Sequence, residues 1–213
     1  MTQSIKPWRD ESARVAKLKP LPLSYYRRET LSLAPDILGK ILVRNIRGKI
    51  LAGRIVEIEA YRSNDPASHA FRGMTERNKV MFEGGGVAYV YFTYGMHFCF
   101  NIVTEAEGSA AAFLVRALEP MAGLKEMKHR RGGGRSTNLT NGPARLCQAM
   151  RIDRSLNGVR LDGTELYICD DGFRVQSDAI ESSPRIGIRE GKNLKWRFFL
   201  KGNEFLSRRQ PRK

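Results

Sequence analysis

Residues 50–61 limit the possible folds of this chain more than any other segment, because their side chains alternate in character. Successive side chains of a strand point to opposite faces, so Val56 and Ile58 would share one face while Glu57 and Glu59 share the other. An apolar face of this kind packs against a core. Both carboxylates are therefore expected to face a groove or solvent.

Further segments of the sequence have strand and helix patterns. Strands are expected at residues 40–44, 87–94, 97–104, 110–118 and 166–169, with a loop from residue 182 that runs into another strand. Helices are expected at residues 24–29, 34–39, 121–131 and 143–150, the last two with a proline near the first turn. Strands and helices are mixed without strict βαβ alternation. The chain is therefore predicted to be an α+β single domain, a curved antiparallel β-sheet with a protruding β-hairpin and flanking helices.

A length of 213 residues suits one such domain. We expect a loosely ordered leader at residues 1–20, the domain itself at residues 21–207 and a basic tail at residues 208–213. No run of roughly 18 apolar residues is present, so no membrane span is expected. The first residues lack the apolar core of a signal peptide, which indicates an intracellular protein, in the cytoplasm or nucleoid of a bacterium or in a nucleus.

The chain is strongly basic. It has 37 Lys and Arg residues against 22 Asp and Glu, a formal net charge of +15. Such a charge favours nucleic acid or another polyanion as the partner. The positive residues are spread along the chain and not collected in one tail, which indicates a basic face on a folded body.

The residue types that bind metals form no recognisable motif in this sequence. His69, His97 and His129 lack HExxH-like spacing. The three cysteines include no CxxC pair, so buried reduced thiols are expected. No GxSxG motif marks a serine nucleophile, and the glycines at 84–86 are not followed by the lysine of a phosphate-binding loop. Neither a metal nor a cofactor is therefore expected.

Glu59 is the carboxylate best placed to carry chemistry. A general base must orient a water molecule and keep its charge. Tyr61 lies two residues further on, so it points to the same side of a regular strand, and a carboxylate beside a tyrosine ring suits a pocket for a flat base. The alternative is a solvated strand glutamate or the partner of an arginine.

Aromatic residues dominate the predicted hairpin. On a strand, Tyr89 and Tyr91 are more often part of sheet packing than of a ligand platform. Tyr94 differs, because it precedes the expected turn at Gly95-Met96. An aromatic ring at a hairpin tip can enter a nucleic-acid stack as a wedge.

Several segments, taken in order, resemble the alkyladenine DNA glycosylase family, also called 3-methyladenine or 3-methylpurine DNA glycosylases. The matching segments are residues 53–61, 68–70, 77–78, 89–91, 94–101, 114–120, 141–149 and 184–188. The resemblance covers about residues 21–207. It implies a monofunctional base-excision-repair enzyme that flips an alkylated or deaminated purine, such as 3-methyladenine or hypoxanthine, out of double-stranded DNA. Hydrolysis of the N-glycosidic bond would leave an abasic site.

The resemblance also implies roles for individual residues. Glu59 would activate the attacking water, and the backbone carbonyl of Arg116 would be the second partner of that water. The flipped base would be held by the rings of Tyr61 and Tyr91, by a hydrogen bond from His69, and by walls at Asn101 and Leu114 that exclude guanine.

Contacts to the duplex follow from the same resemblance. Tyr94 would intercalate into the gap left by the flipped nucleotide, and further contacts would come from Arg77, Met96, His97 and Arg145. A monomer suffices for one damaged site. No lysine or terminal amine is marked out as a Schiff-base nucleophile, so no strand-cleaving step is expected.

The register of the hairpin is a separate prediction. A two-residue turn at Gly95-Met96 would place Tyr91 and Asn101 on opposite faces, although the family pocket uses both. Either the turn is longer or one strand contains a bulge. We therefore predict an irregular hairpin.

Two other functions fit part of the sequence. A non-catalytic nucleic-acid-binding protein would use the same basic, aromatic face, bind without releasing a base and be indifferent to Glu59. An enzyme acting on free nucleosides would leave the charge of +15 unexplained. The ordered set of Glu59, Tyr61, His69 and Arg116 favours the glycosylase.

Overall fold

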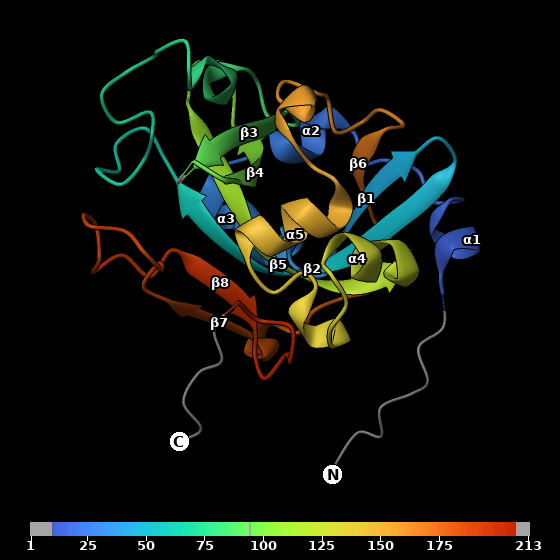
Figure 1. The fold of residues 1–213 in the computed structure, drawn as a ribbon. Coiled ribbons are helices and arrows are strands. Elements are labelled where there is room, and N and C mark those ends of the chain that lie inside the picture. Colours follow the sequence, from blue (N-terminus) through green and yellow to red (C-terminus); the bar gives the residue numbers. More distant parts are fainter. Residues whose placement is uncertain (1–9, 94, 208–213) are drawn as a thin grey trace.

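The computed structural model describes residues 10–93 and 95–207. Within these ranges, eight strands form one antiparallel sheet flanked by helices, so the predicted α+β class is confirmed (Figure 1). The strands are β1 (Ile41–Ile46), β2 (Lys49–Tyr61), β3 (Ala88–Thr93), β4 (His97–Thr104), β5 (Ala111–Ala122), β6 (Leu166–Cys169), β7 (Ile180–Ser183) and β8 (Arg197–Leu200). The helices are α1 (Ser12–Val15), α2 (Leu23–Tyr26), α3 (Thr30–Ile37), α4 (Leu124–Arg130) and α5 (Pro143–Met150).

Strand β2 lies at the centre of the sheet. The strand order β3-β4-β5-β2-β1-β6 places it between β5 and β1. Its first half pairs with β1, from Lys49 to Arg54, and its second half pairs with β8, from Glu57 to Glu59. Strand β7 continues the sheet by pairing with β8. Strand β2 therefore joins the β1-β6 half to the C-terminal strands and, through β5, to the β3-β4 hairpin (Figure 1).

The alternation predicted for residues 50–61 is present in β2. Val56 and Ile58 are fully buried in the main hydrophobic core, where helices α3 and α5 add Leu33 and Met150. Complete burial of an aliphatic side chain of this size contributes about 1.5–3 kcal/mol. The opposite face of β2 carries its carboxylates, and the expectation that these could face solvent is wrong. Both are fully buried, because the arginine side chains of β5 and β8 bind them and the backbone of Ile186 contacts Glu59.

The end of β5 corrects the helix predicted at residues 121–131. Pro120 does not open that helix but lies in β5, which continues to Ala122, and the helix begins at Leu124. The pairing shifts by one residue beside Pro120, which pairs with Gly53. A proline is tolerated in a sheet at such a bulge. Gly123 then turns the chain with a left-handed φ of 75°, which favours glycine.

The last part of the sheet also differs from the prediction. The strand expected after residue 182 lies earlier, at β7, and residues 184–196 form a loop before β8. The start of this loop is held by side-chain contacts and not by strand pairing. The Arg185 guanidinium donates to the carbonyl of Ala60 at 3.0 Å and to Asp65 Oδ1 at 2.9 Å.

The hairpin resolves the predicted conflict of register. Strand β3 ends at Thr93 and β4 begins at His97, so three residues connect them. The longer turn is therefore the correct alternative, and the ladder between β3 and β4 contains no bulge. Tyr91 pairs with Cys99, which places Tyr91 and Asn101 on the same face. Tyr94, the expected wedge, lies outside the described residues.

A membrane-spanning helix was not expected. Among the described residues, no helix has both the length and the apolar character needed to cross a membrane.

Candidate active site

The sheet aligns four predicted or neighbouring site residues in one row. Tyr89 of β3 pairs with Asn101 of β4, Asn101 pairs with Leu114 of β5, and Leu114 pairs with Glu59 of β2. Directly paired residues of antiparallel strands place their side chains on the same face, with Cβ atoms about 4.5–5.5 Å apart. Residues that are distant in sequence therefore meet on one side of the sheet.

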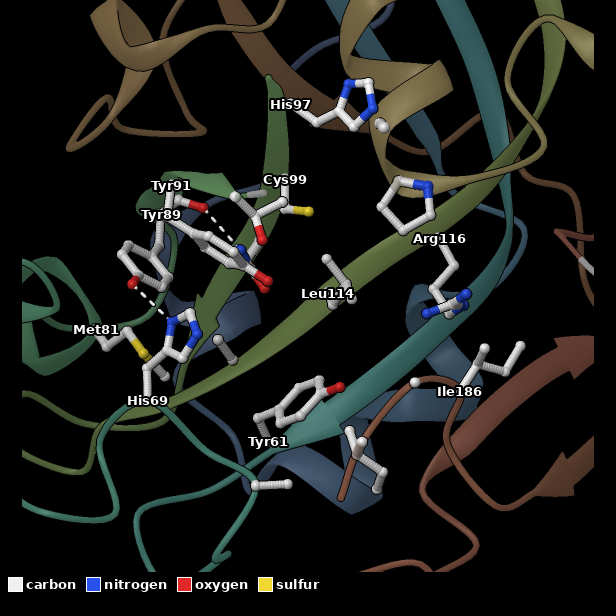
Figure 2. Close-up of a pocket in the computed structure, with 18 of the residues that line it drawn as sticks. Tyr61, His69, Met81, Tyr89, Tyr91, His97, Cys99, Leu114, Arg116 and Ile186 are labelled. Atoms are coloured by element: carbon white, nitrogen blue, oxygen red, sulfur yellow. Dashed lines mark hydrogen bonds between the residues drawn. The ribbon is translucent and has the colours of Figure 1, made fainter. Parts of the chain in front are cut away.

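A cavity of about 490 Å³ opens over this row. Pockets for small organic ligands span about 300–1,000 Å³, so the space is sufficient for a purine base. Figure 2 shows Tyr61, His69 and Tyr91 directed toward it from β2, the following loop and β3. The predicted site residues that line it are Tyr61, His69, Tyr91, His97, Asn101, Leu114 and Arg116.

Glu59 lies beneath the pocket wall formed by Tyr61 and Arg116. It is fully buried and accepts three hydrogen bonds. Oε2 accepts from the Tyr61 hydroxyl at 3.0 Å and from Arg116 Nη1 at 3.1 Å, and Oε1 accepts from the backbone N–H of Ile186 at 2.7 Å. A carboxylate can accept about four hydrogen bonds, so one acceptor position remains. The contact with Ile186 was not predicted.

Arg116 is placed by an irregularity in the pairing of β2 with β5. Glu57 pairs with Ala117 and Ile58 pairs with Val115, so Arg116 has no paired residue on β2. Such a bulge redirects a side chain and removes the backbone of the extra residue from the regular ladder. Arg116 is nevertheless buried, because its guanidinium bridges two carboxylates of β2.

One wall of the pocket is a cluster of aromatic rings. The ring of His69 meets that of Tyr91 edge-on, with centroids 4.5 Å apart, and its Nδ1 lies 3.0 Å from the Tyr89 hydroxyl. Desolvation by the surrounding wall, aided by the positive charge of Arg77, lowers the pKa of His69. Burial raises the pKa of Tyr89 to about 12. The cluster therefore presents neutral rings to the pocket at neutral pH, and Tyr89 belongs to it although no role was predicted for it.

The opposite wall is supported by residues that the sequence prediction left without a role. The guanidinium carbon of Arg185 lies 4.6 Å from the centroid of the Tyr61 ring. Arg185 is itself paired with Asp65, and both side chains are fully buried. This ion pair fixes Tyr61 from behind, and the residue after Arg185 provides the N–H that binds Glu59. The segment at residues 184–188, which matches the glycosylase family, is the signal in the sequence that could have identified Arg185.

The residues expected to contact DNA lie at the surface. Arg77, Met96, His97 and Arg145 are all exposed. Arg77 lies 6.0 Å from the centroid of the Tyr91 ring, and His97 lines the cavity. Arg145 Nη1 donates to Asn141 Oδ1 at 2.8 Å at the start of α5. Arg77 and His97 are thus close to the pocket residues.

The metal-ligand types do not gather in the described part of the chain. Among these residues, no group of three or more His, Cys, Asp or Glu side chains could hold a metal ion. The three cysteines are buried and unpaired, as expected. Cys99 lines the pocket, and burial raises the pKa of its thiol.

Comparison with known families identifies the class of protein to which this chain belongs. A family model described as methylpurine-DNA glycosylase (MPG) matches residues 24–204. This span includes all eight strands and every residue of the pocket. The chain belongs to this family of DNA glycosylases.

Individual relatives agree with the family assignment. Three of them carry the name "Putative 3-methyladenine DNA glycosylase". The protein of Carboxydothermus hydrogenoformans is 50% identical over 189 residues, which is 89% of this chain and 99% of the relative. That of Methanoculleus marisnigri is 45% identical over 191 residues, with the same coverage. That of Prosthecochloris aestuarii is 46% identical over 189 residues, 88% of this chain and 90% of the relative.

Proposed function

We propose that this protein is a monofunctional DNA glycosylase that removes alkylated or deaminated purines, such as 3-methyladenine and hypoxanthine, and leaves an abasic site. The observation that carries the proposal is Glu59, a fully buried carboxylate with one acceptor position left, lying beneath an aromatic pocket of purine size. Its three contacts all require it to be an acceptor, which suits a general base that must keep its charge.

The reaction would begin with extrusion of the damaged nucleotide, since a base inside the duplex is inaccessible. The purine would enter between Tyr61 and Tyr91, which come from opposite walls of the cavity. Stacking on these neutral rings stabilises a flat base, and more so a cationic one. His69 would add a hydrogen bond to the base, because its Nδ1 already contacts Tyr89 and its other ring nitrogen is left for the ligand.

Glu59 would then activate the attacking water together with the backbone carbonyl of Arg116. The bulge at Arg116 supports this role, since it removes that residue from regular pairing. As the glycosidic bond breaks, the sugar becomes oxocarbenium-like, and the Glu59 anion stabilises the developing positive charge. The water oxygen bonds to C1′, its proton passes to Glu59, and the electron pair of the broken C1′–N bond leaves with the base. A cationic 3-methyladenine becomes neutral in this way, whereas hypoxanthine would leave as an anion that takes up a proton from solvent.

Selection against normal guanine would come from Asn101 and Leu114. Both are buried, and they are paired across β4 and β5. Asn101 Nδ2 donates to the carbonyl of Tyr89 at 3.0 Å, which fixes the orientation of the amide. The amide therefore could not rotate to accommodate the exocyclic amino group of guanine. A buried polar group without a partner costs about 1–3 kcal/mol, which disfavours the wrong base.

The DNA partner would be held by the basic surface around the pocket. Arg77, Met96, His97 and Arg145 are exposed and available for the duplex, and Tyr94 would fill the gap in the stack. One lesion presents one flipped nucleotide, so a monomer would be sufficient. The net charge of +15 supports binding to the phosphate backbone.

A single substitution tests the proposal. On duplexes that contain 3-methyladenine or hypoxanthine, Glu59→Gln should lower the single-turnover excision rate by about 10²–10⁴-fold, the usual contribution of a general base. Affinity for the damaged duplex should stay near that of the wild type. Near-full excision by Glu59→Gln would reject this role, and wild-type protein that binds without releasing a base would favour a non-catalytic nucleic-acid-binding protein.

A further inference from the structure

Glu57 is the second carboxylate on the pocket-side face of β2, and the proposed reaction gives it no task. It is fully buried and holds three separate segments of the chain. Oε1 accepts from Arg116 Nε at 3.0 Å, from Arg197 Nε at 2.8 Å and from Ser207 Oγ at 2.7 Å. Oε2 accepts from the backbone N–H of Ser207 at 2.6 Å.

Arg116 connects this carboxylate to Glu59. Its Nε binds Glu57 and its Nη1 binds Glu59, so one planar guanidinium lies between the two carboxylates. Because Arg116 occupies the bulge of β5, no residue of β2 pairs with it. Its position therefore depends on side-chain contacts, which Glu57, Glu59 and the Ser207 hydroxyl (3.3 Å from Nε) supply.

The charges of the network balance only when Glu57 is ionised. Burial raises the pKa of this carboxyl, but the charge of Arg197 and the hydrogen bonds from Ser207 outweigh that effect and lower the pKa below its ordinary value. Glu57 and Glu59 then face Arg116 and Arg197, two negative charges against two positive ones. Without Glu57, Glu59 would be the one carboxylate left in this network to balance the positive charges of Arg116 and Arg197.

We infer that Glu57 is a positioning residue for base excision, which fixes Arg116 at the bulge and offsets its charge beside Glu59. The inference rests on the proposed glycosylase function. It also assigns a role to the C-terminal segment, because the backbone N–H and the hydroxyl of Ser207 both donate hydrogen bonds to Glu57.

The charged environment of Glu59 fixes the sign of the expected effect. The charged or titratable groups around it come from four strands and two loops: Glu57 and Tyr61 on β2, Cys99 on β4, Arg116 on β5, Arg197 on β8, and the pair of Asp65 and Arg185. Of these groups, Glu57 is the negatively charged one that binds the same guanidinium as Glu59, that of Arg116. Its removal takes away a like charge and leaves a guanidinium uncompensated. Both changes leave the site more positive, so the acidic limb of the rate profile is expected to move to lower pH.

The deciding experiment measures the single-turnover excision rate of Glu57→Gln against pH on a damaged duplex, together with the affinity for that duplex. We expect the rate to fall by up to about 100-fold, as for other displacements of about 1 Å at a reacting group. The acidic limb of the rate profile should move to lower pH, while the affinity stays near that of the wild type. A rate and an acidic limb equal to those of the wild type overturn the inference.

A matched control separates this role from simple loss of stability. Asp171 is a largely buried carboxylate that also binds arginine, with Arg54 Nη2 at 2.8 Å, but it lies outside the pocket. Asp171→Asn should lower the thermal midpoint and leave both the rate of the folded enzyme and its acidic limb unchanged. If Asp171→Asn reproduces the effects of Glu57→Gln, the role of Glu57 is structural and the inference fails.

A second variant keeps the test decisive if Glu57→Gln does not fold. Arg197→Gln removes the opposite charge from the same network, so its acidic limb should move to higher pH. A shift to lower pH, or no shift, contradicts the inference. Wild-type protein that excises no base from any damaged duplex would instead reject the proposed function itself, so the two failures are distinguishable.

Discussion

The backbone N–H of Ile186 donates a hydrogen bond of 2.7 Å to Oε1 of Glu59, although 127 positions separate the two residues. The residue before Ile186 is Arg185, which pairs with Asp65 and stacks behind Tyr61. The loop at residues 184–189 is therefore part of the catalytic apparatus that we propose. It holds the carboxylate by its backbone and the adjacent tyrosine by its side chain.

The contact between Tyr61 and Glu59 gives the first prediction. Tyr61→Phe keeps the ring that would stack on the base but removes the 3.0 Å hydrogen bond to Glu59. A hydrogen bond to a charged group contributes about 1.5–3 kcal/mol, so the single-turnover excision rate should fall by about 10- to 100-fold. Tyr91→Phe, which leaves every contact of Glu59 in place, should have a smaller effect on the rate. Equal losses in the two variants would contradict this role for the Tyr61 hydroxyl.

The ion pair between Asp65 and Arg185 leads to a prediction about stability. Both side chains are fully buried, and removal of one partner from such a pair costs about 3–5 kcal/mol. Asp65→Asn should therefore lower the free energy of unfolding by that amount, measured from the urea midpoint at a constant m-value. The double variant Asp65→Leu, Arg185→Met should recover much of the loss, because it leaves no unpaired charge. A single variant with the wild-type midpoint would show that the pair does not hold this loop.

The local part of the site could be predicted from the sequence. Alternation along residues 50–61 places Glu59 and Tyr61 on one face, and the structure has them in contact. The same alternation could not show that Glu57 and Glu59 are buried, since burial depends on β8 and on Arg116 and Arg197. Strand periodicity indicates which face a side chain takes but not what covers that face.

The long-range part of the site could not be derived from local patterns. The register of Tyr91 with Asn101 depends on the number of residues in one turn, and a change of one residue reverses the face. The bulge at Arg116 and the contact of Ile186 with Glu59 depend on how distant segments pair. Because a proline often opens a helix, the sequence predicts Pro120 at the start of the helix at residues 121–131, whereas the adjacent bulge lets it lie in β5.

Tyr94, which lies outside the described residues, supports a prediction about binding. If its ring fills the vacated position in the duplex, Tyr94→Ala should weaken binding to a damaged duplex by about 1–3 kcal/mol, the usual contribution of one stacked base, and weaken binding to an undamaged duplex much less. Competition binding at one fixed salt concentration compares the two affinities. Phe92→Ala, at an exposed aromatic residue of the same hairpin, is the matched control and should leave their ratio unchanged. Equal weakening of both affinities by Tyr94→Ala would reject the wedge.

Asp171 contributes to the pH dependence of the stability of the fold. Burial alone would raise the pKa of its carboxyl, but the hydrogen bonds and charge of Arg54 outweigh burial and hold the pKa well below its ordinary value. A lowered pKa in the folded state means that the stabilisation is complete above the ordinary carboxyl value of about 4 and is lost as the pH falls below it. The difference in thermal midpoint between the wild type and Asp171→Asn should therefore be constant from about pH 5 to 7 and shrink progressively below about pH 4. A difference that stays constant down to pH 2, or grows there, would contradict the ion pair with Arg54 as its source.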